Sequence, residues 1–161
     1  MNALKELMLG PPRRTLAVAE SLTCGQVQAR VGAISGASEF FLGGVTAYAL
    51  EQKVKLLGVS RAKAAAVNSV SAEVAEQMAR GACKLFGSEL AVATTGYAEP
   101  SPEWGVTQPF AWWALAHRRG TRFVAVRSGR VEIHMACRTE VQVMVAEAVI
   151  SELEDYLTTL R

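Results

Sequence analysis

Apolar residues recur with a helical period in two long segments of the chain. The segment from Ser71 to Phe86 places on one helical face Val74, Met78, Ala82 and Leu85. Ser71 can cap this helix, and Gly87 can end it. The segment from Ala136 to Leu157 carries a second stripe, made of Val141, Val145, Val149 and Leu153. We therefore predict helices over residues 71–86 and 136–157.

Short apolar runs, bounded by glycine, proline or charged residues, predict the strands. They cover residues 15–19, 45–48, 90–94, 110–116 and 122–126. Arg118–Thr121 separates the last two runs, so we predict an antiparallel hairpin with a solvated turn. Shorter helices are expected at Ala3–Leu9, from Thr23 onward, and up to Leu57, where Gly58 provides a stop.

The order of these elements indicates the fold class. Strand, helix, strand, helices, strand, hairpin and helix follow one another along 161 residues, of which 50% are hydrophobic. A chain of this length can bury one core, and strands that alternate with helices form layered α/β domains. We therefore predict a single three-layer α/β/α domain with a mixed sheet, spanning residues 1–161.

Charge, cysteine content and hydropathy exclude several classes of function. The 17 Lys and Arg residues against 15 Asp and Glu residues give a net charge of +2, which argues against a nucleic-acid-binding protein. Three well-separated cysteines and two histidines support neither a disulfide framework nor a zinc site. No stretch approaches the roughly 20 apolar residues of a membrane span, so we expect a cytoplasmic protein without a membrane partner.

The clearest candidate chemistry lies in residues 19–25, where a strand is predicted to end and a helix to begin. Such a junction places the hydroxyl of Ser21 beside the unpaired N–H groups of a helix N-terminus, which suit an oxyanion or a phosphate. The alternative is that Ser21 or Thr23 only caps the helix. The pattern by itself leaves both interpretations open.

A candidate base follows the second predicted strand. Tyr48 ends that strand, and Lys53 comes five positions later on the next helix. Lys53 can approach Ser21 because both follow sheet strands, and a desolvated lysine can act as the base of a serine nucleophile. The alternative is a solvent-exposed Lys53 beside Lys55.

Three further features lead to structural expectations. Ser60–Lys63 matches the S-x-x-K string of serine acyl-transferases, but S-D-N and K-T-G are missing, so we expect Ser60 to cap a helix and Lys63 to be solvated. The segment Gly96–Gln108 is predicted to be a long, functional loop. The tryptophans at 112 and 113 are adjacent on a predicted strand, so one is expected to face solvent or a neighbouring protein.

Several ordered blocks of the chain resemble the carboxy-terminal domain of the CinA competence-damage proteins, which also occurs alone in the nicotinamide-nucleotide amidases. Residues 18–25, VAESLTCG, are similar to the family pattern T-A-E-S-x-T-G-G. Residues 41–59 are similar to F-x-G-G-x-V-x-Y-x-N-x-x-K-x-x-x-L-G-V and keep Tyr48 and Lys53. Residues 70–82 match V-S-x-x-V-x-x-x-M-A-x-G-A. The resemblance covers residues 15–153 and implies the fold of that family.

The chain departs from the family pattern near the expected site. Cys24 replaces a glycine, and Leu50 stands where the family has asparagine. The pattern T-G-I-A-G-P-x-G is present as residues 95–102, TGYAEPSP, in which Glu99 replaces a glycine. Gln142 stands where the family has an arginine. A carboxylate in a glycine loop and the loss of a cation both disfavour phosphate binding.

The resemblance implies hydrolysis of the carboxamide of nicotinamide mononucleotide, which gives nicotinate mononucleotide and ammonia. Mapped onto this chain, Ser21 is the nucleophile, and Lys53, helped by Tyr48, is its base. The residues implied to contact the substrate, its oxyanion or its phosphate are Thr23, Gly25, Thr95, Gly96 and Arg138. This scheme requires no metal and no cofactor, its partner is a small-molecule nucleotide, and the resemblance also implies a homo-oligomer.

Two alternatives to an amidohydrolase are open at this point. One is a catalytically impaired relative that binds a nucleotide or a protein, which the substitutions at Cys24, Leu50, Glu99 and Gln142 favour. The other is an interaction module, for which the three tryptophans are the motive. Glu99 also raises the hypothesis of an uncharged substrate, such as a nucleoside or a small amide.

Overall fold

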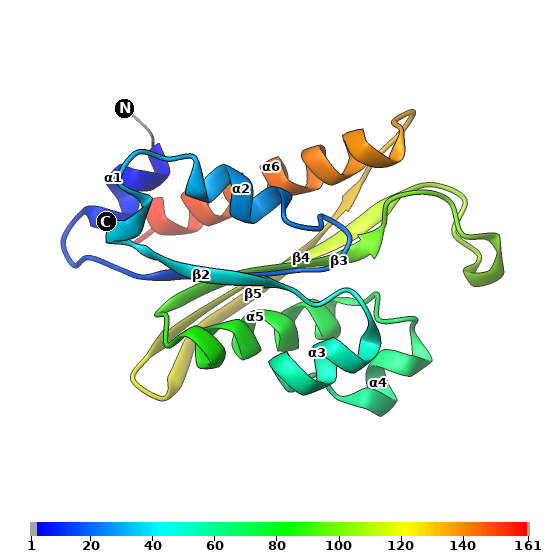
Figure 1. Ribbon diagram of the computed structural model, residues 1–161, viewed down its shortest axis with the longest axis horizontal. Coiled ribbons are helices and arrows are strands. Elements are labelled where there is room, and N and C mark those ends of the chain that lie inside the picture. The colour runs from blue at the N-terminus through cyan, green and yellow to red at the C-terminus, as the bar shows by residue number, and fades with distance from the viewer. Residues whose placement is uncertain (1–2, 161) are drawn as a thin grey trace.

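A five-stranded mixed sheet forms the centre of the computed structural model, which describes residues 3–160 (Figure 1). Its strands are β1 (Leu16–Glu20), β2 (Phe41–Thr46), β3 (Leu90–Tyr97), β4 (Phe110–Arg119) and β5 (Arg122–Glu132). They lie in the order β2-β1-β3-β4-β5. β1 pairs in parallel with β2 and β3, whereas the β3–β4 and β4–β5 pairs are antiparallel. The predicted mixed sheet is confirmed.

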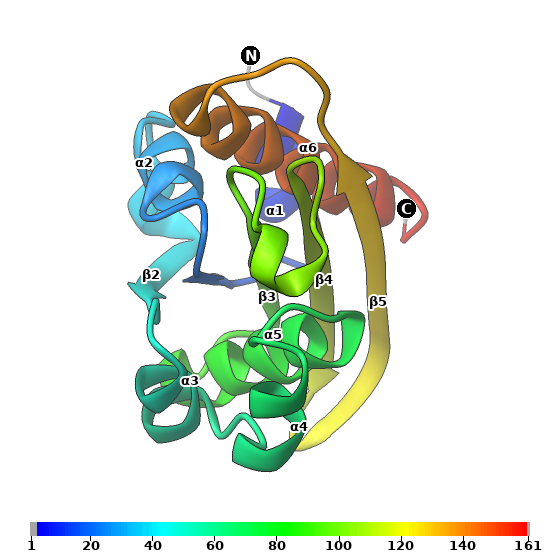
Figure 2. The same cartoon turned by 90° about the vertical axis from the view of Figure 1, so that its right-hand side faces the viewer.

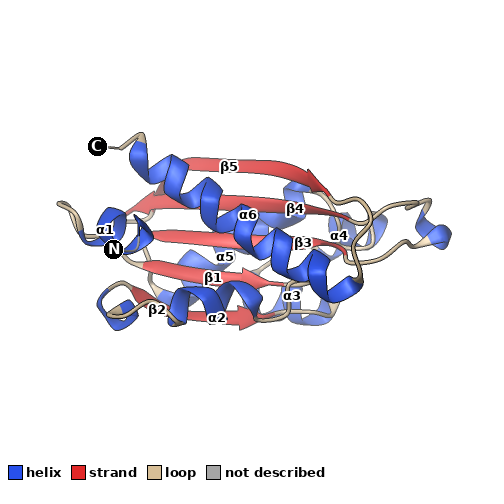
Figure 3. Ribbon diagram, turned by 90° about the horizontal axis from the view of Figure 1, so that it is seen from above, coloured by secondary structure: helices blue, strands red, loops and turns tan. Residues whose placement is uncertain are grey.

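Helices cover both faces of this sheet. One face carries α1 (Ala3–Leu9), α2 (Gln26–Gly32) and α6 (Arg138–Thr158), and the other carries α3 (Leu50–Leu57), α4 (Arg61–Ala66) and α5 (Ala72–Phe86) (Figures 1 and 3). Short 3-10 helices lie in two connections, at Ala37–Glu39 and Pro102–Trp104. The α/β/α layering is therefore as predicted. None of the helices between residues 3 and 160 is long and apolar enough to cross a bilayer.

The two faces of the sheet differ in side-chain size, because side chains alternate between faces along each strand. The face under α1, α2 and α6 carries the larger residues Leu16, Val18, Leu90, Val92 and Leu115. The face under α5 carries Ala17, Ala19, Ala91, Ala93, Ala114 and Ala116. All of these side chains are buried. The small alanine side chains let α5 pack close to the sheet.

α3 packs against α5 at a glycine. A Cβ atom placed on Gly81 would lie 2.1 Å from the carbonyl oxygen of Leu57, the last residue of α3. Leu57 is itself buried together with Met78 and Ala82 of α5. Any side chain at position 81 must therefore push the two helices apart, and α3 is the helix that carries Lys53.

The two long helices follow the sequence prediction closely. The Ser71 side chain accepts a hydrogen bond from the backbone N–H of Val74 at 3.1 Å, and Gly87 ends α5 with a left-handed φ of 72°. The predicted stripe on α6 is completely buried: Val141, Val145, Val149 and Leu153. Local capping chemistry and helical period were sufficient for these elements.

The second strand begins earlier than predicted. β2 starts at Phe41 rather than at residue 45, and it includes Gly43 and Gly44. A Cβ atom on Gly43 would come within 2.9 Å of the Phe86 ring, and one on Gly44 within 2.6 Å of the Gln28 side chain. These glycines permit close packing of helices on the two faces of an edge strand.

Other boundaries also move. β3 continues to Tyr97 and β4 to Arg119, so the predicted loop and the predicted hairpin turn are both shorter than expected. α2 begins at Gln26 and α6 at Arg138, each later than predicted. Backbone pairing across the sheet extends the strands beyond their most apolar residues.

Several expected side-chain orientations are wrong. Leu85 is 47% exposed, and Cys83 is buried in the last turn of α5 instead. Trp112 and Trp113 are both partly buried, because one packs against each helical layer. Ser60 occupies the N-cap of α4, but its side chain makes no capping hydrogen bond. Lys63 is exposed as expected and pairs with Glu73.

The carboxyl ends of the three parallel strands lie at one end of the molecule, which Figure 2 views end-on. From β1 the chain passes to α2 on one face, and from β2 it passes to α3 on the opposite face. A crevice forms where neighbouring parallel strands connect to opposite faces. The connection after β3, residues 98–109, projects from the same end (Figure 2).

We predict that Gly81→Ala destabilises the protein although alanine is the better helix former. The clash with the Leu57 carbonyl should lower the free energy of unfolding by about 2 kcal/mol. Urea unfolding measures this change. Gly32→Ala is the matched control, since a Cβ there meets nothing within 4 Å, and it should raise the free energy of unfolding by about 0.5 kcal/mol. Equal effects of the two substitutions would contradict the proposed α3–α5 contact.

Candidate active site

Ser21 stands directly after β1, at the carboxyl end of the most protected strand of the sheet. All five residues of β1 are buried, and the backbone N–H of Ser21 donates to the carbonyl oxygen of Thr94 in β3 at 3.0 Å. The backbone at Ser21 is therefore held by the sheet. Only 8% of the residue is exposed.

Lys53 contacts Ser21 directly. Its Nζ lies 3.0 Å from Ser21 Oγ and donates a second hydrogen bond to the backbone carbonyl oxygen of Tyr48 at 2.6 Å. The residue is 1% exposed, so the alternative of a solvated lysine is wrong. Neighbouring Lys55 is exposed, as a surface residue of the same helix.

The position of Lys53 in α3 explains this contact. α3 begins at Leu50, immediately after the segment that follows β2, and Lys53 belongs to its first turn. Side chains on a helix point back toward its N-terminus, and here that direction leads to the carboxyl end of β1. The parallel pairing of β1 with β2 therefore brings Ser21 and Lys53 together.

Burial lowers the pKa of Lys53 to about 8, from an ordinary value of 10.5. The cause is desolvation of the ammonium group by burial. Neither of its two acceptors carries a charge that would offset this desolvation. About one tenth of Lys53 is then a neutral amine at pH 7, and about half at pH 8. A neutral amine 3.0 Å from a hydroxyl can remove its proton.

Tyr48 contributes in two separate ways. Its carbonyl oxygen holds Lys53, whereas its phenol is half exposed and accepts a hydrogen bond from Arg138 Nη2 at 2.7 Å. Arg138 Nη1 donates to Glu99 Oε1 at 2.8 Å. Residues from three separate segments thus form one network at the mouth of the site.

Thr95 and Gly96 lie at the end of β3. The Thr95 hydroxyl donates to the backbone carbonyl of Ser69 at 2.7 Å, so its remaining capacity is to accept a hydrogen bond. It cannot also donate to an oxyanion. Gly96 allows β3 to approach β4, since a Cβ there would lie 2.4 Å from the Phe110 carbonyl oxygen.

A cavity of about 570 Å³ brings most of the predicted residues together. Its lining includes Ser21, Tyr48, Lys53, Thr95, Gly96, Glu99 and Arg138. Leu50, which stands at the family's asparagine position, also lines it. The cavity lies at the carboxyl ends of β1, β2 and β3, where the topology predicts a ligand site.

Thr23 and Gly25 are not part of this cavity lining. The Thr23 hydroxyl is buried and shares a 2.7 Å hydrogen bond with Thr94. The N–H of Gly25 donates to Glu20 Oε2 at 3.0 Å. The structure therefore gives both residues a role in shaping the turn between β1 and α2.

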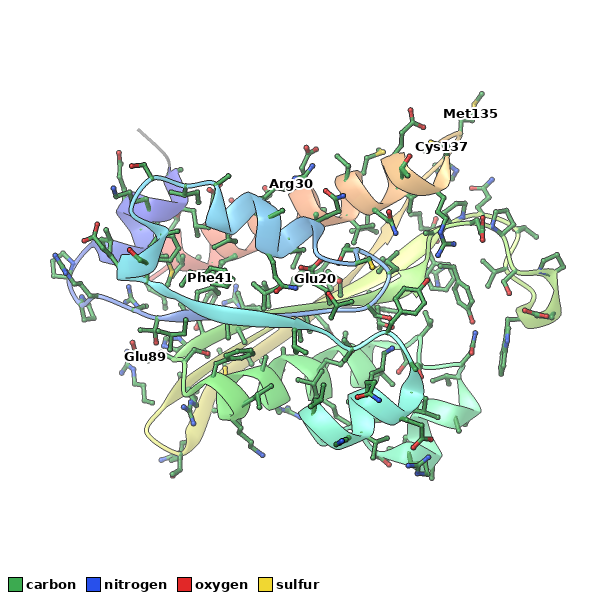
Figure 4. The ribbon with its side chains drawn as sticks, in the orientation of Figure 1. Glu20, Arg30, Phe41, Glu89, Met135 and Cys137 are labelled. Carbon is green, nitrogen blue, oxygen red and sulfur yellow. The ribbon has the colours of Figure 1, made fainter. Side chains whose placement is uncertain are left out.

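Glu20 has a structural role at this turn that the sequence analysis did not predict. Its buried carboxylate accepts hydrogen bonds from the N–H groups of Gly25, Val27 and Gln28, at 2.9–3.1 Å (Figure 4). Glu20 therefore caps α2, and neither Ser21 nor Thr23 does so. The expectation that these N–H groups are free for a bound anion is wrong. The sequence signal was a carboxylate at the end of an apolar strand.

Two of the residues that depart from the family pattern, Gln142 and Cys24, are outside the cavity lining. Gln142 donates from Nε2 to the carbonyl oxygen of Leu22 at 2.8 Å and so ties α6 to the turn after Ser21. Cys24 is exposed and has a left-handed φ of 47°, at a position where the family has glycine. Cys24, Cys83 and Cys137 are all free thiols.

Within residues 3–160, no group of three or more His, Cys, Asp or Glu side chains is arranged to hold a metal ion. The side chains that line the cavity include hydroxyl, amine, guanidinium and carboxylate groups. Ser21 and Lys53 form a hydroxyl–amine pair, and Tyr48, Glu99 and Arg138 form the hydrogen-bonded network at the mouth.

Comparison with solved structures supports this fold over the whole chain. A competence/damage inducible protein, CihA, from Agrobacterium tumefaciens superposes with a TM-score of 0.82 at 26% identity, covering 98% of this chain and 97% of that one. A competence-damaged protein (CinA) superfamily protein from Klebsiella pneumoniae superposes with a TM-score of 0.84 at 24% identity, covering 99% of each chain.

Sequence relatives belong to the same group. A CinA-like protein of Geobacter metallireducens is 48% identical over 109 residues, which are 66% of this chain and 26% of that protein. A CinA-like protein of Chlorobium limicola is 34% identical over 152 residues, which are 93% of this chain and 35% of that protein. The chain thus spans about a quarter to a third of the length of these relatives. The family model of the CinA C-terminal domain matches residues 3–157, and this chain belongs to that family.

Proposed function

We propose that this chain is a serine amidohydrolase that hydrolyses the carboxamide of nicotinamide ribosyl compounds, of which nicotinamide mononucleotide is the member that the family resemblance implies. The observation that carries the proposal is the buried contact of 3.0 Å between Lys53 Nζ and Ser21 Oγ. The products are the corresponding nicotinate compound and ammonia. Nicotinamide mononucleotide is accordingly the small-molecule nucleotide partner, and a homo-oligomer remains part of the proposal.

In the first half of the reaction, neutral Lys53 removes the proton of Ser21 as Oγ attacks the carboxamide carbon. The tetrahedral intermediate collapses when its C–N bond breaks. The protonated Lys53 gives its proton to the departing nitrogen, which leaves as ammonia. An ester between Ser21 and the nicotinoyl group remains.

In the second half, Lys53 removes a proton from the water that attacks this ester. The ester C–O bond breaks, and Lys53 returns the proton to Ser21 Oγ. The Tyr48 carbonyl oxygen holds one N–H of Lys53 throughout and so keeps the amine directed at the serine. The positive charge that Lys53 carries after the attack also stabilises the adjacent oxyanion.

Thr95 has a chemistry suited to orienting the amide. Because its proton is donated to the Ser69 carbonyl, the Thr95 oxygen can accept a hydrogen bond from the NH2 group of the carboxamide. This contact discriminates an amide from the carboxylate product, which has no N–H to donate. Arg138 and Tyr48 are placed at the mouth, where they can contact the ribosyl part.

Substitution of either reacting residue should abolish ammonia release from nicotinamide mononucleotide and nicotinamide riboside. We expect Ser21→Ala to lower kcat/KM by at least about 1,000-fold and Lys53→Ala by about 100- to 10,000-fold. Lys55→Ala, on the exposed side of the same helix, should leave kcat/KM unchanged. Release that persists in purified Ser21→Ala contradicts the mechanism, and an inactive wild type favours the alternative of a catalytically impaired nucleotide-binding relative.

The pH dependence of the reaction should report the neutral amine of Lys53. We expect kcat/KM to increase with pH and to level off above an inflection near pH 8, the pKa of Lys53. Steady-state ammonia release between pH 6 and about 10 measures this profile. The profile of Lys55→Ala should coincide with that of the wild type, whereas an inflection near 10 in the wild type would contradict a desolvated base.

Lys53→Met should be more stable than the wild type at pH 7 and inactive. The folded-state pKa of Lys53 is below its unfolded value, so its charge destabilises the fold most below pH 8, and this penalty disappears between pH 8 and 10.5. Removing the amine should therefore raise the free energy of unfolding by about 1–2 kcal/mol at pH 7. Urea unfolding at pH 7 and pH 10 measures the gain, which should be smaller at pH 10. A loss of stability at pH 7 would contradict this account.

A further inference from the structure

Both terminal nitrogens of Arg138, the guanidinium in the cavity lining, already donate hydrogen bonds to other residues of the site. Nη1 donates to Glu99 Oε1 at 2.8 Å, and Nη2 donates to the Tyr48 phenol oxygen at 2.7 Å. A phosphate group binds arginine most strongly through two parallel N–H donors. A phosphate that takes both terminal nitrogens of Arg138 therefore competes with the Glu99 carboxylate and the Tyr48 phenol.

The charges around the cavity also disfavour an anion. Among the described residues that line it, the charged ones are Lys53, Arg138, Glu99 and Glu103. Lys53 acts as a base only when it is neutral, and the remaining charged lining residues are one cation, Arg138, and two carboxylates, Glu99 and Glu103. The phosphate monoester of a nucleotide itself carries about −1.5 to −2 charges near neutral pH.

No other cation of this site compensates for Glu99. Gln142, at the family's arginine position, bonds the Leu22 carbonyl and is outside the cavity lining. The N–H groups at the start of α2 are bound by Glu20. Gln142 and these N–H groups are therefore committed to contacts within the fold.

From these contacts we propose that Glu99 makes the site selective for carboxamides without a phosphate group, with the pyridinium nucleoside nicotinamide riboside preferred over nicotinamide mononucleotide. The inference rests on the proposed function and defines its substrate class. The pyridinium ring of the riboside carries one positive charge and no compensating phosphate. This positive charge is attracted to the carboxylates of Glu99 and Glu103, whereas the phosphate of the mononucleotide is repelled by them.

The solvent exposure of Glu99 limits the size of this effect. The Glu99 side chain is 63% exposed and that of Arg138 is 43% exposed, so their interaction with a ligand is partly screened. We therefore expect about a tenfold preference for the riboside in kcat/KM, rather than complete exclusion of the mononucleotide. The preference should decrease as salt is raised from about 0.02 M to 0.5 M.

The test compares the two substrates in the wild type and in Glu99→Gln, which keeps the shape of the side chain and removes its charge. The ratio of kcat/KM for riboside over mononucleotide should fall about tenfold in this variant, mainly because the mononucleotide improves. Glu147→Gln is the matched control. Glu147 is an exposed carboxylate that pairs with Arg30 at 3.6 Å and is outside the cavity lining, so its ratio should equal that of the wild type.

Calorimetry measures the Kd values of the riboside and the mononucleotide in Ser21→Ala, with and without Glu99→Gln. This measurement separates the two proposals, because it needs no turnover. If neither compound releases ammonia, the proposed function fails, whereas tighter binding of the riboside that depends on Glu99 still supports the selection. Equal affinities, binding of neither compound, or a ratio that Glu99→Gln leaves unchanged overturns the selection by Glu99.

Discussion

The candidate site depends on one buried contact, that between the Lys53 amine and the Ser21 hydroxyl. An ammonium group that is 1% exposed and has only uncharged acceptors is costly to bury, so the surrounding structure must hold it in place. The parallel β1–β2 pair and the first turn of α3 provide the position. The same burial lowers the pKa of Lys53, and this makes the amine useful as a base.

Features far from the serine support that contact. The alanine face of the sheet lets α5 pack closely, and Gly81 lets α3 approach α5. On the opposite face, Glu20 caps α2 and Gln142 ties α6 to the turn after Ser21. The first two interactions position α3, which carries Lys53, and the last two hold the turn that follows Ser21. The site is therefore positioned from both helical layers.

The sequence predicted the elements whose determinants are local. The α6 stripe and the Ser71 cap needed only helical period and capping chemistry, and the family blocks identified Ser21 and Lys53. The burial of Lys53 could not be predicted from composition, because it results from strand order. The roles of Gly43 and Thr95 likewise depend on partners distant in the chain, namely Phe86 and Ser69, whereas Glu20 binds N–H groups only five to eight residues later. Tertiary contacts of this kind leave no periodic signal in a single sequence.

Titration of the Lys53 side chain itself tests the central claim most directly. Protein labelled with 13C at lysine Cε gives one resonance per lysine, and Lys53→Arg assigns the resonance of this residue by its disappearance. The account predicts that the Lys53 resonance titrates with a midpoint near pH 8, well below the ordinary lysine value of 10.5. A Lys53 midpoint near 10.5 would contradict the account, because the amine would then be solvated and protonated where it should act as a base.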